Sequence, residues 1–150
     1  MRISRPRGFT MIEVLVVMVI VAIAAVSVTL ALRDSHQTQL EREAERLAAL
    51  LESARAEARV SGVPVRWRPV SDASGHGFRF EGLPEKIQLP QRWLGDEVQV
   101  EIEGAPSLLL GPEPLIPAQA LRLRLGVYSV RISSDGLAPF TVQPATQEPG

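Results

Sequence analysis

The feature that most constrains this chain is a long apolar run that follows a short basic leader. Over 9–32 the only charged residue is Glu13. A helix over this range is about 36 Å long, which is enough to cross a hydrocarbon core of roughly 30 Å. Basic residues precede the run and no acidic residue does, so the positive-inside rule predicts a cytoplasmic N-terminus and export of the rest. These basic residues are Arg2, Arg5 and Arg7.

Two other interpretations of this run remain open. An ordinary signal peptide would be cut at a small-residue site such as Ala22-Ile23-Ala24. An acidic Glu13 just before the apolar core argues against it, and so does the helical pattern that continues past the cleavage site. The second alternative is a simple single-pass anchor that never polymerises.

The junction between leader and run reads Arg7-Gly8-Phe9-Thr10-Met11-Ile12-Glu13. This order resembles the class III signal of type IV pilins and of their secretion relatives, the pseudopilins. The resemblance implies that a prepilin peptidase cuts after Gly8 and methylates the new N-terminal residue, Phe9. It also implies a filament subunit rather than an enzyme.

Glu13 needs a partner if the run is in the membrane, because a carboxylate there costs about 2.5–3.5 kcal/mol. Cleavage after Gly8 would create a free amine at Phe9, four residues earlier. The resemblance implies that Glu13 neutralises this amine in a neighbouring subunit during filament assembly, which would set the axial stagger between helices. The alternative is that Glu13 is solvated among lipid headgroups.

The helical pattern continues beyond the apolar run. Apolar residues recur at steps of three and four, with charged residues mostly between them. They are Leu40, Ala44, Leu47, Ala48, Leu51, Ala54 and Ala58. Gly62 and Pro64 predict the end of the helix. The amphipathic second half, 33–62, therefore needs a partner surface.

The region 63–150 predicts that surface, because it is rich in turns and in alternating strands. We expect strands at 63–67, 77–81, 97–103, 121–125, 127–133 and 139–142. Ser134-Asp135-Gly136 predicts the turn between the last two. The predicted fold class is α+β, in which one long helix packs on antiparallel sheet. The predicted organisation is a leader at 1–8, a membrane or filament-core helix at 9–32, its amphipathic continuation at 33–62 and a β-rich periplasmic domain at 63–150.

Four further segments, at 45–58, 61–65, 111–117 and 130–136, resemble the H-type minor pseudopilin of type II secretion, the general secretion pathway protein H (GspH/FimT-like) family. The resemblance implies a pilin-like fold and a structural subunit near the tip of a periplasmic pseudopilus. It implies the prepilin peptidase, other minor pseudopilins, the major pseudopilin and the inner membrane as partners. The alternative is a FimT-like minor type IV pilin that acts in pilus assembly or DNA uptake. The resemblance implies no nucleic acid for the secretion subunit, and the tail at 144–150 has no basic residue.

Catalytic, cofactor and metal sites are not expected. The chain has no cysteine, and its two histidines, His36 and His76, are too far apart in sequence for a recognisable metal spacing. Asp72 near His76 could bind an ion, but a solvated turn is the simpler interpretation. A binding module released by a signal peptidase is a third interpretation of the whole chain.

Two tryptophans are candidates for a partner surface, since tryptophan is favoured at interaction hot spots. Trp67, on a predicted strand, is expected in the core. Trp93, in an apparent loop, is the candidate partner contact. The alternating charges on two predicted strands also favour adjacent faces, with Arg122 opposite Glu101.

Overall fold

The structure of this chain is a computed structural model that describes residues 10–72, 75–95 and 97–147, with the side chains at 25–34, 72 and 75 excepted. The chain divides into two compact units, Met1–Ser35 and His36–Gly150. Each is described by itself. The leader and the cleavage junction at Gly8 and Phe9 lie outside the described residues.

Helix α1 comprises Met11–Ser61. It begins after Thr10, whose hydroxyl oxygen accepts the backbone N–H of Glu13 at 3.3 Å, an N-cap contact that a helix start requires. It ends at Gly62, whose φ of 68° allows the left-handed turn that stops a helix. The Gly62 N–H bonds to the Ala58 carbonyl at 2.9 Å. The predicted end of the helix is thus confirmed.

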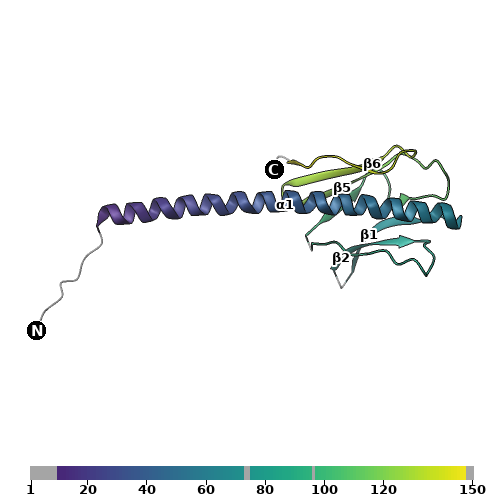
Figure 1. The fold of residues 1–150 in the computed structure, drawn as a ribbon, viewed down its shortest axis with the longest axis horizontal. Coiled ribbons are helices and arrows are strands. Elements are labelled where there is room, and N and C mark those ends of the chain that lie inside the picture. The colour runs from purple at the N-terminus through teal and green to yellow at the C-terminus, as the bar shows by residue number, and fades with distance from the viewer. Residues whose placement is uncertain (1–9, 73–74, 96, 148–150) are drawn as a thin grey trace, which may run out of the picture. The chain divides into compact units, whose positions relative to one another are not determined.

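Two antiparallel sheets make up the rest of the second unit (Figure 1). The first has the order β2-β1-β4, with β1 at Arg66–Asp72, β2 at Gly75–Glu81 and β4 at Leu108–Leu109. The second has the order β3-β5-β6, with β3 at Gln99–Ile102, β5 at Gln119–Leu125 and β6 at Tyr128–Ser134. The short strands β7 (Thr141–Val142) and β8 (Thr146–Gln147) both pair with β6.

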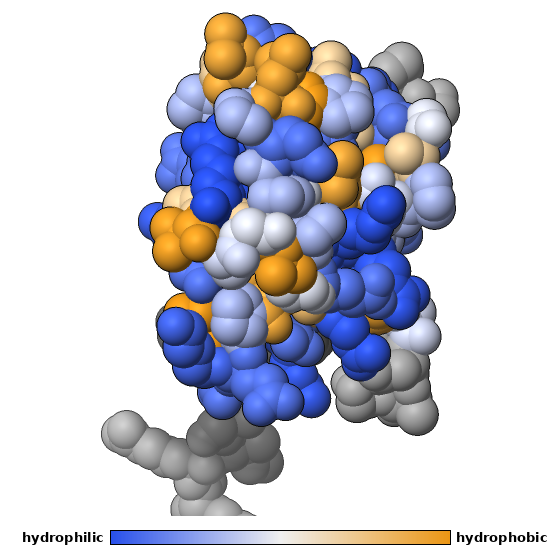
Figure 2. Space-filling view, turned by 90° about the vertical axis from the view of Figure 1, so that its right-hand side faces the viewer, coloured by the Kyte–Doolittle hydropathy of each residue, from blue (hydrophilic) through white to orange (hydrophobic). Residues whose placement is uncertain are grey.

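The amphipathic stripe of α1 forms the core with the inner faces of both sheets (Figure 1). Every residue of the predicted stripe from Leu40 to Ala58 is buried. Fully buried residues of the sheets include Trp67, Phe78 and Leu123. The face of the molecule in Figure 2 is mostly hydrophilic, with separate hydrophobic residues among the hydrophilic ones. The α+β prediction of a long helix on antiparallel sheet is therefore confirmed, and the fold is pilin-like.

Several predicted strand boundaries were wrong. The first strand was expected at 63–67, but it begins at Arg66, because Pro64 has no N–H to donate and follows the helix end directly. The strand expected at 97–103 is shorter, and β4 and β8 were missed. Both missed strands have two residues, which is too few to show alternation. The turn at 134–136 does join an antiparallel pair, β6 and β7.

A side-chain amide links the two sheets by hydrogen bonds. The Gln119 amide, at the start of β5, donates to the Leu109 carbonyl at 2.8 Å and accepts the Leu109 N–H at 2.6 Å. This arrangement reproduces a pair of backbone sheet hydrogen bonds. It therefore continues the hydrogen bonding of β4 in the first sheet to the second sheet.

Candidate functional site

The first turns of α1 carry an exposed apolar surface. The large apolar residues of 11–23 are all at least 48% exposed in this structure, and Met11 reaches 92%. A contiguous apolar surface of this kind marks a site of contact with protein or lipid. Glu13 is exposed on the same stretch, one turn after the N-cap residue Thr10. The exposed apolar stretch is the candidate assembly site, and Glu13 is its one acidic group.

No helical segment among the described residues is both long and apolar enough to cross a membrane. The membrane span predicted over 9–32 is therefore not found there, and it stays a prediction from the sequence.

Two polar clamps fix the loops of the second unit to α1. In the first clamp, the Glu43 carboxylate, 0% exposed, accepts the Leu94 N–H at 2.7 Å. Arg46 bonds to the other oxygen of Glu43 at 2.7 Å and donates to the Arg92 carbonyl at 3.1 Å. The buried carboxylate is thus satisfied by one cation and one backbone N–H, as burial of a charge demands. The clamp holds the segment 92–94 against the helix.

The second clamp has the same spacing, nine residues along the helix. Glu52 accepts the Phe140 N–H at 2.9 Å. Arg55, only 1% exposed, lies 3.7 Å from Glu52 and donates to the carbonyls of Gly136 at 2.6 Å and Ala138 at 3.0 Å. Here the arginine rather than the glutamate is buried. This clamp fixes the turn that joins β6 to β7.

The turn itself is organised by Asp135, whose carboxylate accepts the N–H groups of Leu137 at 2.9 Å and Ala138 at 2.8 Å. These backbone hydrogen bonds, first that of Ala138, hold the pKa of Asp135 below its ordinary value. Gly136 follows with a φ of 94°. A Cβ there would collide with the Ile116 carbonyl, so only glycine fits this position.

The Trp93 side chain, the candidate partner contact, is buried in this structure. The residue lies outside the named strands, as predicted, but its side chain is only 8% exposed. Its ring lies 4.7 Å from that of Phe78 and 6.5 Å from that of Trp67, measured between centroids. The first clamp draws the loop inward and buries the ring, and local sequence could not reveal this. Trp67 is in the core as expected.

The two histidines have different surroundings. His36 packs beside the turn at Gly126, whereas His76 is exposed and bonds to the Ser71 hydroxyl at 2.9 Å. The side chain of Asp72 is outside the described residues. Within the described ranges, no three His, Cys, Asp or Glu side chains gather where they could hold a metal ion.

The charged outer face of the second sheet matches the expectation from its alternating charges. Glu101 and Arg122 are register partners on β3 and β5. Two ion pairs run diagonally, from Arg124 to Glu101 and from Arg122 to Glu103, each at 3.7 Å. A closer pair joins Glu103 and Arg131 at 2.8 Å, and this hydrogen bond lowers the pKa of Glu103.

The fold and the N-terminal segment together define a pilin-like subunit. The sequence matches the prokaryotic N-terminal methylation motif over residues 3–29. It also matches the family described as type II transport protein GspH over residues 43–136, more than half of the chain. The chain therefore belongs to the GspH family, whose pseudopilins are structural subunits. No curated protein and no solved structure matches it significantly.

Proposed function

We propose that this chain is a minor pseudopilin of the type II secretion pseudopilus, a structural and non-enzymatic subunit near the tip that helps export folded proteins across the outer membrane. The observation that carries the proposal is the pairing of the two family matches. The methylation motif covers the start of α1, and the GspH match covers the first clamp, both helix residues of the second clamp and most of the sheets.

The proposal includes processing and anchoring. A prepilin peptidase cleaves between Gly8 and Phe9 and methylates Phe9, and the segment 9–32 anchors the subunit in the inner membrane with the second unit in the periplasm. Glu13 then meets the amine of Phe9 on a neighbouring subunit. The exposure of Glu13 supports this role, since its carboxylate is open to such a partner. The other partners are further minor pseudopilins and the major pseudopilin.

Intact mass tests the processing. A mature protein that begins at Phe9 and carries one additional methyl group is expected. A cut near Ala22-Ile23-Ala24 would contradict the proposal and support a secreted module instead.

A gene deletion tests the pathway. The expected result is that exoproteins stay trapped in the periplasm while pilus motility and DNA uptake are normal. Normal secretion with lost motility or uptake would assign the chain to a FimT-like minor type IV pilin. Complementation with the wild-type chain and with Glu13→Leu completes the design, and only the wild-type chain is expected to restore secretion.

A further inference from the structure

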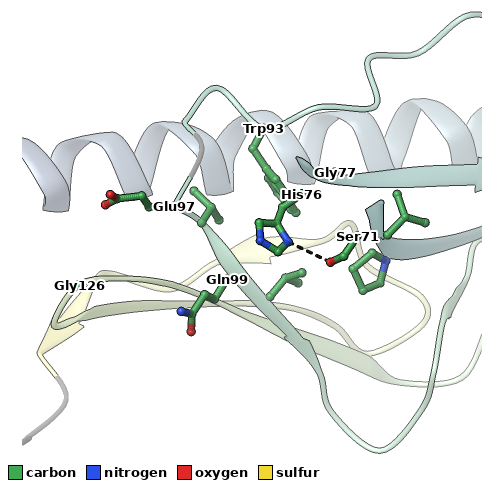
Figure 3. Close-up of a pocket in the computed structure, with 11 residues that line it drawn as sticks. Ser71, His76, Gly77, Trp93, Glu97, Gln99 and Gly126 are labelled. Atoms are coloured by element: carbon green, nitrogen blue, oxygen red, sulfur yellow. Dashed lines mark hydrogen bonds between the residues drawn. The ribbon is translucent and has the colours of Figure 1, made fainter. Parts of the chain in front are cut away.

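A groove of about 600 Å³ separates the β1–β2 hairpin from the edge of β3 (Figure 3). Pro69, Val70 and Ser71 line it from β1, and residues 97–100 line it from the other side. Trp93 and His76 also line it. The groove therefore lies between the edges of the two sheets, and one sheet contributes each wall.

The β3 wall presents unpaired backbone groups to this groove. The Glu103 N–H bonds to the Ala120 carbonyl at 2.9 Å, so in an antiparallel pair the groups of Val98 and Val100 point the opposite way, away from β5. Within the described part of the chain, no residue pairs with them. A strand edge in this state is a template for another strand.

Two other strand edges are covered among the described residues. The outer edge of β2 receives the segment at Gln91, whose carbonyl accepts the Phe78 N–H at 2.9 Å. The outer edge of β6 pairs with both β7 and β8. The edge of β3 thus differs from these two in having no cover among the described residues.

The β1 wall cannot accept a full strand. The Val65 carbonyl bonds to Leu110 on the β4 side of β1, so the alternation places the nitrogen of Pro69 on that same side, beyond the end of the two-residue β4. Proline has no N–H, and it is tolerated in a strand where the edge is unpaired. An occupant would therefore pair with β3 and contact β1 through side chains only.

The lining defines the chemistry of the occupant. Val70, Val98 and Val100 supply apolar surface, and Glu97 supplies an exposed negative charge. No lysine or arginine is among the described residues that line the groove. This composition fits an extended segment whose alternate side chains are apolar, with a basic residue near Glu97.

We propose that this groove receives an extended segment of a neighbouring pilin-like subunit, which adds as a strand to the edge of β3. The inference rests on the proposed function, because assembly into a filament is what places a second pilin-like subunit beside this one. A segment of about four residues, roughly 13 Å long, matches the length of β3. Backbone hydrogen bonds to β3 provide affinity, and the valine-lined wall provides selectivity.

Site-specific photo-cross-linking in cells that assemble the filament tests the proposal. A photoreactive amino acid at Gln99, which lines the groove, is expected to capture a pilin-like subunit. The matched control is Thr141, which is also exposed but lies in β7 at the opposite edge of the same sheet. A probe at Val17, on the exposed apolar surface of α1, reports whether the chain contacts other subunits at all.

A pair of proline variants then tests the strand addition itself. Val100→Pro removes an N–H that points away from β5, so the β3–β5 hydrogen bonds are kept. Val142→Pro is the matched control, since the Gln143 N–H bonds to Arg131 and the Val142 N–H therefore points away from β6. We expect Val100→Pro to abolish the cross-link from Gln99 and Val142→Pro to keep it. Glu97→Lys provides a second test that does not depend on the stability of the proline variants, because residue 97 is exposed. We expect it to reduce the cross-link from Gln99 severalfold by charge repulsion.

The outcomes separate the two proposals. Cross-links from Val17 without any from Gln99 above the Thr141 level would overturn the groove and leave the proposed function standing. Cross-links from neither probe would overturn both. Capture of a protein that is not pilin-like at Gln99, or cross-linking that survives both Val100→Pro and Glu97→Lys, would also overturn the groove as a strand-addition site.

Discussion

Arg55 provides the sharpest test of how α1 holds the sheets. Its guanidinium group is 1% exposed and donates to the carbonyls of Gly136 and Ala138 in the turn between β6 and β7. Arg55→Met removes these donors while keeping most of the apolar stem that fills the site. We expect it to loosen this turn and to lower the free energy of unfolding of the second unit.

The magnitude follows from the contacts. Hydrogen bonds to a charged group contribute about 1.5–3 kcal/mol each. Both carbonyls keep another donor, the Ile116 N–H for Gly136 at 3.3 Å and the Ser134 hydroxyl for Ala138 at 2.7 Å, so neither becomes an orphan acceptor. Removal of a buried cation whose Nε has no partner among the described residues also relieves a desolvation penalty. The net loss is therefore about 2–3 kcal/mol, or roughly 30- to 150-fold in the unfolding equilibrium.

Denaturant unfolding of the full chain in detergent measures this loss. Both tryptophans of the chain, Trp67 and Trp93, lie in the buried aromatic cluster, so their fluorescence reports the second unit alone. The control is Arg59→Met, one turn further along α1, where an exposed side chain makes a single bond of 3.3 Å to the Pro114 carbonyl. It should cost less than about 0.5 kcal/mol. Equal losses for the two variants would refute the claim that the buried clamp holds the turn.

Three further predictions use the same fluorescence assay. Gly136→Ala adds a steric collision with the Ile116 carbonyl to backbone strain, and it should lower the free energy of unfolding by about 2–4 kcal/mol. The control Gly104→Ala has a φ of 74° but open space for a Cβ, so it should cost only about 1 kcal/mol. Similar losses for the two variants would show that the close approach of Ile116 to Gly136 is unimportant. Gln119→Ala removes both bonds between the sheets and should cost about 1–3 kcal/mol, and no loss would show that the sheets are joined by packing alone. The hydrogen bond from Arg131 lowers the pKa of Glu103 below its ordinary value in the folded state, so the stabilisation is fully present above the ordinary pKa and is lost as the pH falls through the folded pKa. Glu103→Gln should therefore make the unfolding midpoint vary less between neutral pH and about pH 3. If the midpoint depends on pH as strongly as in the wild-type chain, the Glu103–Arg131 pair does not contribute to stability in this way.

The parts of the fold that were predictable carry long, regular patterns. The stripe from Leu40 to Ala58 repeats over five turns, and all of its residues are buried as expected. The charge alternation on β3 and β5 likewise predicted that their charged faces are adjacent, and the structure makes Glu101 and Arg122 register partners. Strands β4 and β8 were missed because two residues show no period, and their pairing is decided by distant partners.

The clamps show where local sequence reasoning stops. Glu43 with Arg46 and Glu52 with Arg55 are visible in the sequence as favourable pairs one turn apart. Such pairs are normally solvated, and nothing in their spacing distinguishes Glu43, which is fully buried, from Glu52, which is 33% exposed. Burial depends on which loop lies over each pair. Long-range contacts determine which loop covers each pair, so the burial could not be inferred from the helix sequence alone.

The first clamp also orders one wall of the groove beside β3. The first clamp binds the Leu94 N–H and the Arg92 carbonyl, and the neighbouring residue Trp93 lines the groove. The carbonyl of Gln91 pairs with β2, so this segment is held from both sides. A partner strand therefore meets a wall that is ordered in advance, which lowers the conformational entropy lost on binding. Glu43 is fully buried and does not line the groove, so it acts on the edge of β3 by fixing the loop beside it.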